Sequence, residues 1–236
     1  MSRRPLALAA AQPVVTAGDL EATVAAHVAA VRMAAARVVV FPEMSLTGYV
    51  LDAPSVALDD PALEPVVDAC AEAGALALVG APVAGPDGLD LNALLAVDAD
   101  GVTMAYAKVW VDESEAGRFA VGDGPVVIDV DGWRLGLAVC RDTRFPEHDA
   151  ATAALGMDVY VAGVVHHGHE PDVAGERARR VAADRGVWVA TASYAGPTGE
   201  GFDSTAGRSG IWSPSGEAIA GAGPAPGEVA RAVLAP

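Results

Sequence analysis

The sequence predicts an α/β protein whose sheets are covered by helices on one face and by another sheet on the other. Strand-like segments alternate with helix-like ones along most of the 236 residues, and β-hairpins are inserted between the helical crossovers. Several of the predicted strands are apolar at every position, so we expect both of their faces to be buried. The sequence contains no low-complexity linker, internal repeat or domain boundary, and we therefore expect a single domain over residues 1–236.

In the first half of the chain, the elements are marked by apolar runs, helical periodicity and turn residues. Residues 19–36 are typical of a helix, with Asp19 near its start. Residues 61–74 predict a second helix, because proline stands in the first turn and glycine at the end. The other segments are strands at residues 6–12, 37–43 and 75–83, and a hairpin at residues 91–109 that turns on Asp98-Ala99-Asp100-Gly101.

The second half repeats this alternation. A hairpin is expected at residues 125–140, where Asp131-Gly132 is a strong turn signal. Residues 195–207 are rich in Gly, Ser and Thr, which predicts a surface loop. The remaining segments are helices at residues 146–155 and 174–186, strands at residues 157–165 and 187–194, and a last hairpin at residues 208–223 across Pro214-Ser215-Gly216.

The composition indicates a folded protein and excludes several classes of partner. Hydrophobic residues make up 52% of the chain, mostly Ala and Val, and charged residues only 19%. The formal net charge of −16 disfavours nucleic acids and anionic membrane surfaces, which are themselves negative. No stretch approaches the roughly 20 apolar residues that a membrane-spanning helix needs.

The N-terminal residues resemble a signal peptide, with a basic start, an apolar run and small residues. The apolar run at residues 6–11 is short for the core of such a signal, and it also fits a first buried strand. We interpret it as part of the fold and expect a cytoplasmic protein.

The two cysteines lie in different surroundings. Cys70 falls in an amphipathic helical segment, which predicts an inert core residue. Cys140 ends an apolar run and is followed at once by polar residues. The carboxyl end of a strand is where α/β folds place reactive groups, so Cys140 is the candidate nucleophile.

Two further residues share this position at the end of an apolar strand. Lys108 is the only lysine among 15 basic residues, which suggests a task that arginine performs poorly. Its ammonium is compact and its pKa can be tuned, whereas arginine is planar and permanently charged. Glu43 follows the apolar run at residues 38–42, and its carboxylate either is solvated in a loop or points into a site shared with Cys140.

At these three positions the sequence resembles the nitrilase superfamily, the carbon–nitrogen hydrolases. The segments FPEMSLTGY (residues 41–49), AYAKVW (105–110) and LAVCRDTRFPE (137–147) look like the three signature regions of that family. Four further blocks resemble the family in the same order along the chain, so that the likeness covers nearly all of it. These are AAAQP (9–13), DESEAGRF (112–119), RRVAADRGVWVATAS (179–193) and GRSGIWSPSGEA (207–218).

The resemblance implies a four-layer α-β-β-α sandwich of the nitrilase type and a set of catalytic roles. Glu43 would be the general base, Lys108 would stabilise the anionic tetrahedral intermediate, and Cys140 would form a thioester. The backbone N–H of Arg141 would be a second oxyanion donor. Glu115 would orient the substrate or Lys108, or help to activate water. No metal and no cofactor would be needed.

Two stretches depart from the family pattern. His148-Asp149-Ala150 stand where an arginine is common, and Arg185 stands where an asparagine is usual. We expect these changes to affect packing or an oligomer interface rather than the chemistry. Family members commonly pair across helical faces, so a homodimer or a higher homo-oligomer is expected.

The residues around the nucleophile favour amides over nitriles. Cys140-Arg141-Asp142 is closer to the Cys-x-Asp pattern of amidase-like branches than to the Cys-Trp-Glu of true nitrilases. We therefore predict hydrolysis of a small linear amide. An N-carbamoyl compound hydrolase and a noncatalytic nitrilase-like binding protein are the alternatives.

Several residues are candidates for the substrate pocket. The Arg141 guanidinium either pairs with a substrate carboxylate or forms a structural ion pair. Tyr49 lines the pocket or is a partly buried structural residue. His166 and His167 follow the strand that the resemblance places beside the nucleophile strand, and they could line the pocket. The spacing in HHGHE matches no established zinc pattern, and a metal site is therefore not predicted.

Overall fold

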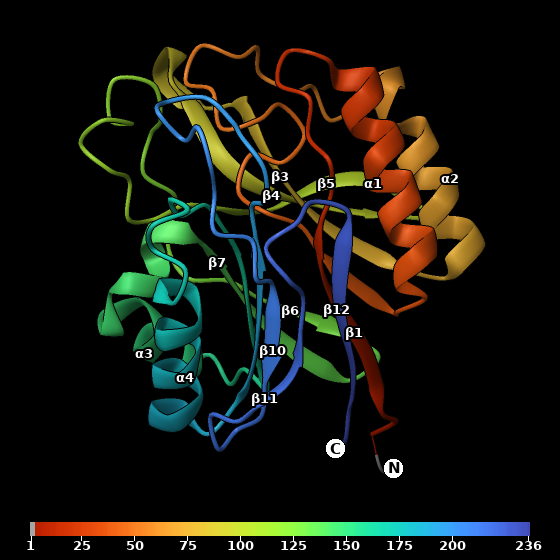
Figure 1. Cartoon of the computed structure of the whole chain (residues 1–236), viewed down its shortest axis with the longest axis vertical. Helices are drawn as coiled ribbons and strands as arrows, with labels where there is room; N and C mark the ends of the chain where they lie inside the picture. Colours follow the sequence, from red (N-terminus) through yellow and green to blue (C-terminus); the bar gives the residue numbers. More distant parts are fainter. Residues whose placement is uncertain (1–2) are drawn as a thin grey trace.

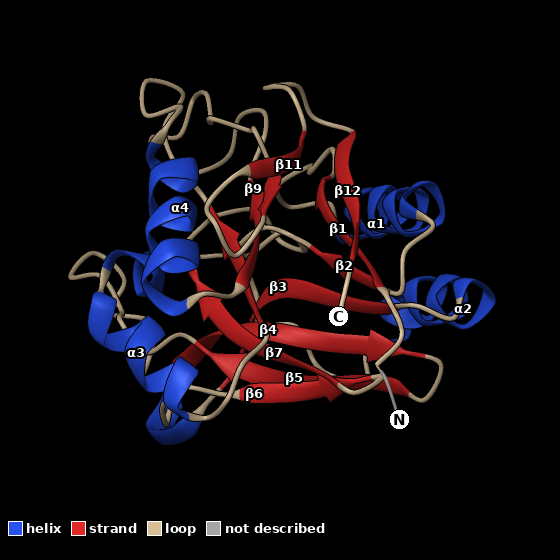
Figure 2. Cartoon of the chain, turned by 90° about the horizontal axis from the view of Figure 1, so that it is seen from below, coloured by secondary structure: helices blue, strands red, loops and turns tan. Residues whose placement is uncertain are grey.

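The computed structural model describes residues 3–236 and contains two six-stranded mixed sheets packed face to face. In Figures 1 and 2, one pair of helices covers the outer face of the first sheet, and a second pair covers the outer face of the second. The layers therefore run helix, sheet, sheet, helix. This is the α-β-β-α sandwich that the resemblance implied.

The first sheet is parallel in its centre and antiparallel at both edges, and its strand order is β12-β1-β2-β3-β4-β5. The parallel pairs are β1 with β2 and β2 with β3. The strands are β1 (Leu6–Gln12), β2 (Val38–Val40), β3 (Leu76–Ala84), β4 (Asp90–Asp98), β5 (Gly101–Ala107) and β12 (Glu228–Leu234).

The second sheet has the strand order β11-β10-β9-β8-β7-β6, and its sequence of pairings matches that of the first sheet when it is read from β6. Its parallel pairs are β7 with β8 and β8 with β9. The strands are β6 (Val127–Val130), β7 (Trp133–Val139), β8 (Val159–Val164), β9 (Trp188–Ser193), β10 (Gly210–Trp212) and β11 (Ala218–Gly221).

The helices begin and end at the residues that the sequence marks. Helix α1 (Leu20–Ala34) is capped by Asp19, whose carboxylate accepts from the N–H of Ala22 at 2.9 Å. Helix α2 (Glu64–Ala73) ends at Gly74, which has the left-handed conformation of a C-cap. The other helices are α3 (Pro146–Ala154) and α4 (Val173–Arg185), and the short 3₁₀ turns are η1 (Pro61–Leu63), η2 (Pro86–Gly88) and η3 (Cys140–Arg144).

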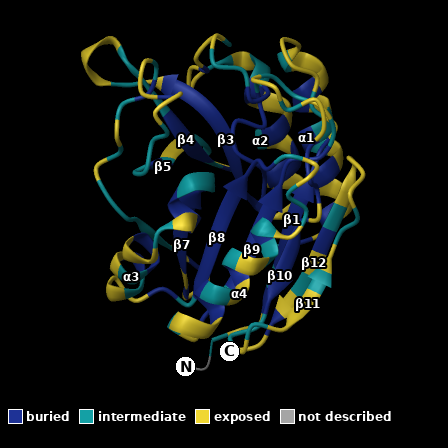
Figure 3. Cartoon of the chain, turned by 60° about the vertical axis from the view of Figure 1, so that its left-hand side comes forward, coloured by how far each residue is buried: buried dark blue, intermediate teal, exposed yellow. Residues whose placement is uncertain are grey.

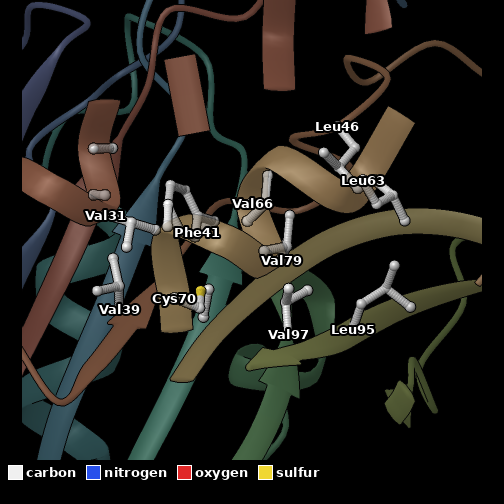
Figure 4. Packing of buried hydrophobic residues seen from close by; sticks show 14 of the residues in the cluster. Val31, Val39, Phe41, Leu46, Leu63, Val66, Cys70, Val79, Leu95 and Val97 are labelled. Atoms are coloured by element: carbon white, nitrogen blue, oxygen red, sulfur yellow. The ribbon is translucent and has the colours of Figure 1, made fainter. Parts of the chain in front are cut away.

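Small apolar side chains fill the three interfaces between the layers. Figure 4 shows the cluster that packs α1 and α2 against the first sheet, including Val31, Val66 and Cys70. A second cluster lies between the two sheets, and a third packs against α4. Figure 3 shows the same division, since the central strands are buried while the outer surface of α4 is largely exposed. Cys70 is completely buried, as predicted.

The structure differs from the expected elements in three places. Strand β2 ends at Val40, so residues 41–43 lie beyond the strand, although the N–H of Phe41 still donates to the carbonyl of Leu78 on β3 at 2.8 Å. The C-terminal residues form β12, which pairs antiparallel with the whole of β1. The predicted surface loop at residues 195–207 contains no helix or strand, but its end at residues 205–207 is buried.

The residues that depart from the family pattern form contacts between α3 and α4. The completely buried carboxylate of Asp149 accepts from Arg180 at 2.7 Å and from Arg185 at 2.6 Å. His148 lies between the hydroxyls of Tyr106 and Tyr160, each at 2.9 Å. These residues therefore join the two helices to each other, and through Tyr106 on β5 and Tyr160 on β8 they join α3 to both sheets.

Across residues 3–236, none of the helices is both long and apolar enough to cross a bilayer.

Candidate active site

One pocket, with a cavity volume of about 420 Å³, collects the side chains that follow the strands of both sheets. Glu43 follows β2, Lys108 follows β5, Cys140 follows β7 and His166 follows β8. The pocket is lined by Glu43, Tyr49, Leu51, Lys108, Asp112, Ser114, Cys140, Arg141, Arg144, Val165, His166, His167, Glu170, Arg177, Glu200 and Phe202. The three residues singled out at strand ends therefore meet in one place.

Lys108 lies between two buried carboxylates. Its Nζ donates to Oε1 of Glu43 at 2.8 Å and to both oxygens of Glu115 at 2.8 Å. The three side chains are almost inaccessible to solvent, with exposed fractions of 2%, 1% and 0%. Burial alone would lower the pKa of Lys108, but the charges of Glu43, Cys140 and Glu115 raise it above its ordinary value. Lys108 is therefore a fixed cation at the floor of the pocket.

Each of these carboxylates is also held by a second donor. The Nδ2 of Asn92, on β4, donates to Oε1 of Glu43 at 2.9 Å. The hydroxyl of Tyr49 donates to Oε1 of Glu115 at 2.9 Å, and the N–H of Asp112 donates to its Oε2 at 2.8 Å. The other oxygen of Glu43, Oε2, is buried and has no hydrogen-bond partner among the described residues. This oxygen is available to take a proton.

Two glycines hold the backbone of residues 41–43 in place from opposite sheets. A Cβ on Gly80 of β3 would lie 2.2 Å from the carbonyl oxygen of Pro42. A Cβ on Gly163 of β8 would lie 2.5 Å from the carbonyl oxygen of Phe41 and 2.9 Å from the N–H nitrogen of Glu43. Only glycine permits these approaches, so the position of Glu43 depends on both residues.

Replacing Gly163 by alanine is expected to displace Glu43 and to lower kcat by about 10²-fold, the loss that a misplacement near 1 Å can cause. The matched control is Gly221→Ala, because Gly221 also lies in a strand and an added Cβ there meets no atom within 4 Å. Steady-state kinetics and thermal unfolding would be measured for both variants. Equal activity of the two variants, with Gly163→Ala folded, would contradict this assignment.

Cys140 stands at a sharp turn between β7 and η3. Its φ of +38° is in the left-handed region, which is unusual for a residue with a side chain. The buried carboxylate of Asp142 supports this turn by accepting from the N–H of Val139 at 2.9 Å and from the hydroxyl of Tyr106 at 2.7 Å. The other oxygen of Asp142 accepts from the N–H of Trp110 at 2.8 Å, which ties the turn to the segment after Lys108.

Burial favours the neutral, protonated form of both the Cys140 thiol and the Glu43 carboxyl group. Burial raises the pKa of Cys140, and the charge of Glu43 raises it further, while Lys108 acts in the opposite sense. Burial also raises the pKa of Glu43, against the charge of Lys108 and with that of Glu115. The thiol is therefore protonated at neutral pH and needs a base to become a nucleophile.

The chain is similar to known hydrolases, several of which are named amidases. The family model described as carbon–nitrogen hydrolase matches residues 6–234. The chain belongs to the carbon–nitrogen hydrolase family. Cys140 lies in the region that holds the catalytic cysteine of this family.

Three relatives illustrate the likeness of this hydrolase to others. The "hydrolase in pqqF 5′ region" of Pseudomonas protegens is 30% identical over 90% of this chain and 75% of its own length. An (R)-stereoselective amidase of a Pseudomonas species is 29% identical over 52% of this chain and 46% of its own. A structure of a Nesterenkonia amidase of the nitrilase superfamily superposes with a TM-score of 0.86 at 25% identity, covering 97% of this chain and 90% of that one.

The residues predicted to line the substrate pocket of this hydrolase do lie in the pocket wall, and each makes different contacts. Tyr49 is buried and both lines the pocket and holds Glu115. His166 and His167 both line the pocket, and the ring of His167 stacks on Phe202 with centroids 4.1 Å apart. The Arg141 guanidinium forms an ion pair with Asp112, which is the structural alternative of the two that the sequence left open.

The hydrolase fold adds site residues that sequence reasoning did not single out. Asn92 is a polar residue inside an apolar strand, and this interruption was a usable signal. Phe202 and Glu200 come from the glycine-rich loop, and Arg177 comes from the inner side of α4. Nothing in the sequence distinguishes Arg177 from the other arginines of that helix.

Proposed function

We propose that this hydrolase cleaves the carbon–nitrogen bond of a small linear amide through a thioester on Cys140. The observation that carries the proposal is the convergence of a thiol, a buried ammonium and a buried carboxylate on one pocket, with a second buried carboxylate bonded to the ammonium. Amidases among the relatives support amide hydrolysis as the reaction class. Cys140, Lys108, Glu43 and Glu115 are the proposed catalytic set.

In the first half-reaction, Oε2 of Glu43 takes the proton of the Cys140 thiol as Sγ attacks the amide carbonyl carbon. The carbonyl oxygen becomes an oxyanion, which Lys108 Nζ and the Arg141 N–H stabilise. The N–H groups of a first helical turn have no acceptor within the helix, and Arg141 is the second residue of η3. Glu43 then gives the proton to the departing nitrogen, the carbon–nitrogen bond breaks, and ammonia or an amine leaves.

In the second half-reaction, Glu43 takes a proton from water as the water oxygen attacks the thioester carbon. The carbon–sulfur bond breaks, the carboxylic acid leaves, and the proton returns to the Cys140 sulfur. Glu115 holds Lys108 in position throughout, and its contacts with Tyr49 and Asp112 support that role.

The test is ammonia release from a panel of small linear amides, nitriles and N-carbamoyl compounds, with the Cys140→Ala variant in parallel. We expect turnover of at least one amide and none by the variant. Turnover confined to N-carbamoyl compounds would establish the alternative carbamoyl hydrolase. A lack of turnover across the panel, with Cys140 unreactive to iodoacetamide, would favour a noncatalytic binding protein.

The pH dependence of kcat/KM is expected to have an acidic limb above 4.5, the ordinary pKa of a glutamate. Glu43 must be ionised to accept the thiol proton, and burial raises its pKa, so it becomes protonated and inactive at a higher pH than a solvated carboxylate. Measurement of kcat/KM between about pH 4 and 9 checks this. Full activity down to the ordinary glutamate pKa would contradict a buried base.

A cytoplasmic location and a homo-oligomeric assembly remain predictions from the sequence. Sedimentation equilibrium would test the second.

A further inference from the structure

Arg177 is a half-buried cation in the pocket wall, and no carboxylate in the described part of the chain lies within ion-pair distance of it. It extends from α4, and its Nη1 donates to Thr143 Oγ1 at 3.3 Å and to His166 Nε2 at 3.3 Å. Both partners are neutral, and both contacts are long. By contrast, Arg141 in the same wall is paired with Asp112.

His166 contributes a neutral ring and a fixed donor beside Arg177. Burial, together with the charge of Arg177, lowers the pKa of His166 to about 4. Because a guanidinium only donates, Nε2 of His166 must accept, and the proton of the neutral imidazole is on Nδ1. That buried Nδ1 has no hydrogen-bond partner among residues 3–236. Arg177 and His166 therefore have N–H donors without hydrogen-bond partners in this part of the chain, and neither side chain carries a negative charge.

The acidic side chains of the pocket are already engaged elsewhere. Glu43 is held by Lys108 and Asp112 by Arg141. The other two acids bind backbone at the rim: Glu170 accepts from the N–H of His167 at 3.3 Å, and Glu200 accepts from the N–H of Leu51 at 3.0 Å.

A guanidinium that is partly removed from water without an ion-pair partner costs free energy, and burial lowers the pKa of Arg177 against the charges of Cys140 and Glu170, which raise it. A bound anion would offset that cost. The pocket holds about 420 Å³, enough for a small organic acid but not a large ligand.

We propose that Arg177 binds a carboxylate of the substrate, so that this enzyme prefers linear amides carrying a carboxylate over neutral amides of the same length. The inference rests on the proposed amide hydrolysis and names its substrate class. A guanidinium binds a carboxylate through two parallel N–H donors, which orients the substrate as well as selecting it.

The test compares kcat/KM for two amides with the same four-carbon chain, succinamic acid and butyramide, in the wild type and in Arg177→Gln. We expect the wild type to favour succinamic acid by about 10–100-fold, the range of a charge-assisted hydrogen bond, and Arg177→Gln to lose that ratio mainly through KM. Arg177→Lys, which keeps a point charge without the planar fork, should restore part of it. Arg179→Gln is the matched control, because Arg179 is exposed on the same helix and should keep the wild-type ratio.

A second pair, N-carbamoyl-β-alanine and N-propylurea, places the carboxylate on the amine side of the scissile bond. Loss of the carboxylate preference in Arg177→Gln for either pair supports the proposal and shows on which side the anion lies. A wild type without preference, or a preference that survives in Arg177→Gln, overturns it. Equal losses on charged and neutral members also overturn it.

Binding separates a failure of this inference from a failure of the proposed function. Calorimetric titration of the Cys140→Ala variant with succinamic acid measures affinity without turnover. We expect tighter binding than for butyramide and at least about a 10-fold loss when Arg177→Gln is added. If this binding preference is found but the wild type turns over no amide, the proposed reaction is overturned and the carboxylate site is kept. Turnover of butyramide with no binding preference would overturn the site and keep the reaction.

Discussion

Replacing Lys108 by methionine is expected to lower kcat/KM by at least about 10³-fold, because the reaction loses the ammonium that stabilises the oxyanion. The same change leaves Glu43 and Glu115 buried beside each other without a counter-ion. Removal of one partner from a buried ion pair typically costs about 3–5 kcal/mol of the free energy of unfolding. Steady-state kinetics and urea denaturation would measure the two effects separately.

Lys108→Arg is the control that separates charge from geometry. Arginine keeps the positive charge, but its planar guanidinium is larger than an ammonium that lies 2.8 Å from both carboxylates. We expect this variant to retain more stability than Lys108→Met and little of the activity. Wild-type kcat/KM in Lys108→Arg would show that position 108 needs only a charge, which would contradict the interpretation of the chain's single lysine.

Glu43→Gln is expected to lower kcat/KM by about 10²–10⁴-fold, the range for loss of a general base. The change suits the site because the retained Oε1 can still accept from Lys108 and Asn92. The new amide group replaces Oε2, the oxygen that has no partner in residues 3–236. The variant should therefore fold with its neighbours in place and lack only the proton acceptor.

Thiol alkylation gives a substrate-free measure of the same base. Iodoacetamide should modify Cys140 faster than Cys70 in the wild type, because Cys70 is completely buried whereas Cys140 lines the same pocket as Glu43. Glu43→Gln should slow the modification of Cys140 and leave that of Cys70 unchanged. An unchanged rate at Cys140 in a folded Glu43→Gln variant would remove Glu43 from the role of base.

The fold was largely predictable because its elements carry local signals. The N-cap Asp19, the C-cap Gly74 and the Asp131-Gly132 turn act within a few residues, and the structure follows them. Strand β12 was missed because its pattern is polar on one side and its partner β1 is more than two hundred residues away in sequence. Strand β2 was too long in the prediction, since the close approach of Gly80 and Gly163 to residues 41–43 depends on both sheets.

The site residues that follow strands could be predicted from the sequence. Those whose contacts depend on tertiary packing could not. Glu43, Lys108 and Cys140 each follow an apolar run in the sequence, and the structure brings all three to one pocket. The pairing of Arg141 with Asp112 and the unpaired state of Arg177 depend on how α4 and the loop after Lys108 each pack against η3. No local pattern encodes such a choice of ion-pair partner among several arginines.

The most direct test of the account is detection of the acyl-enzyme. The wild type would be mixed with an amide that it turns over, quenched in acid within the first turnovers, and examined by intact mass and peptide mapping. We predict a mass increase equal to the acyl group, located on the peptide that contains Cys140 and absent from Cys140→Ala. Steady turnover with no acyl adduct on Cys140 under any quench, or with full activity in Cys140→Ala, would contradict thioester catalysis by this residue.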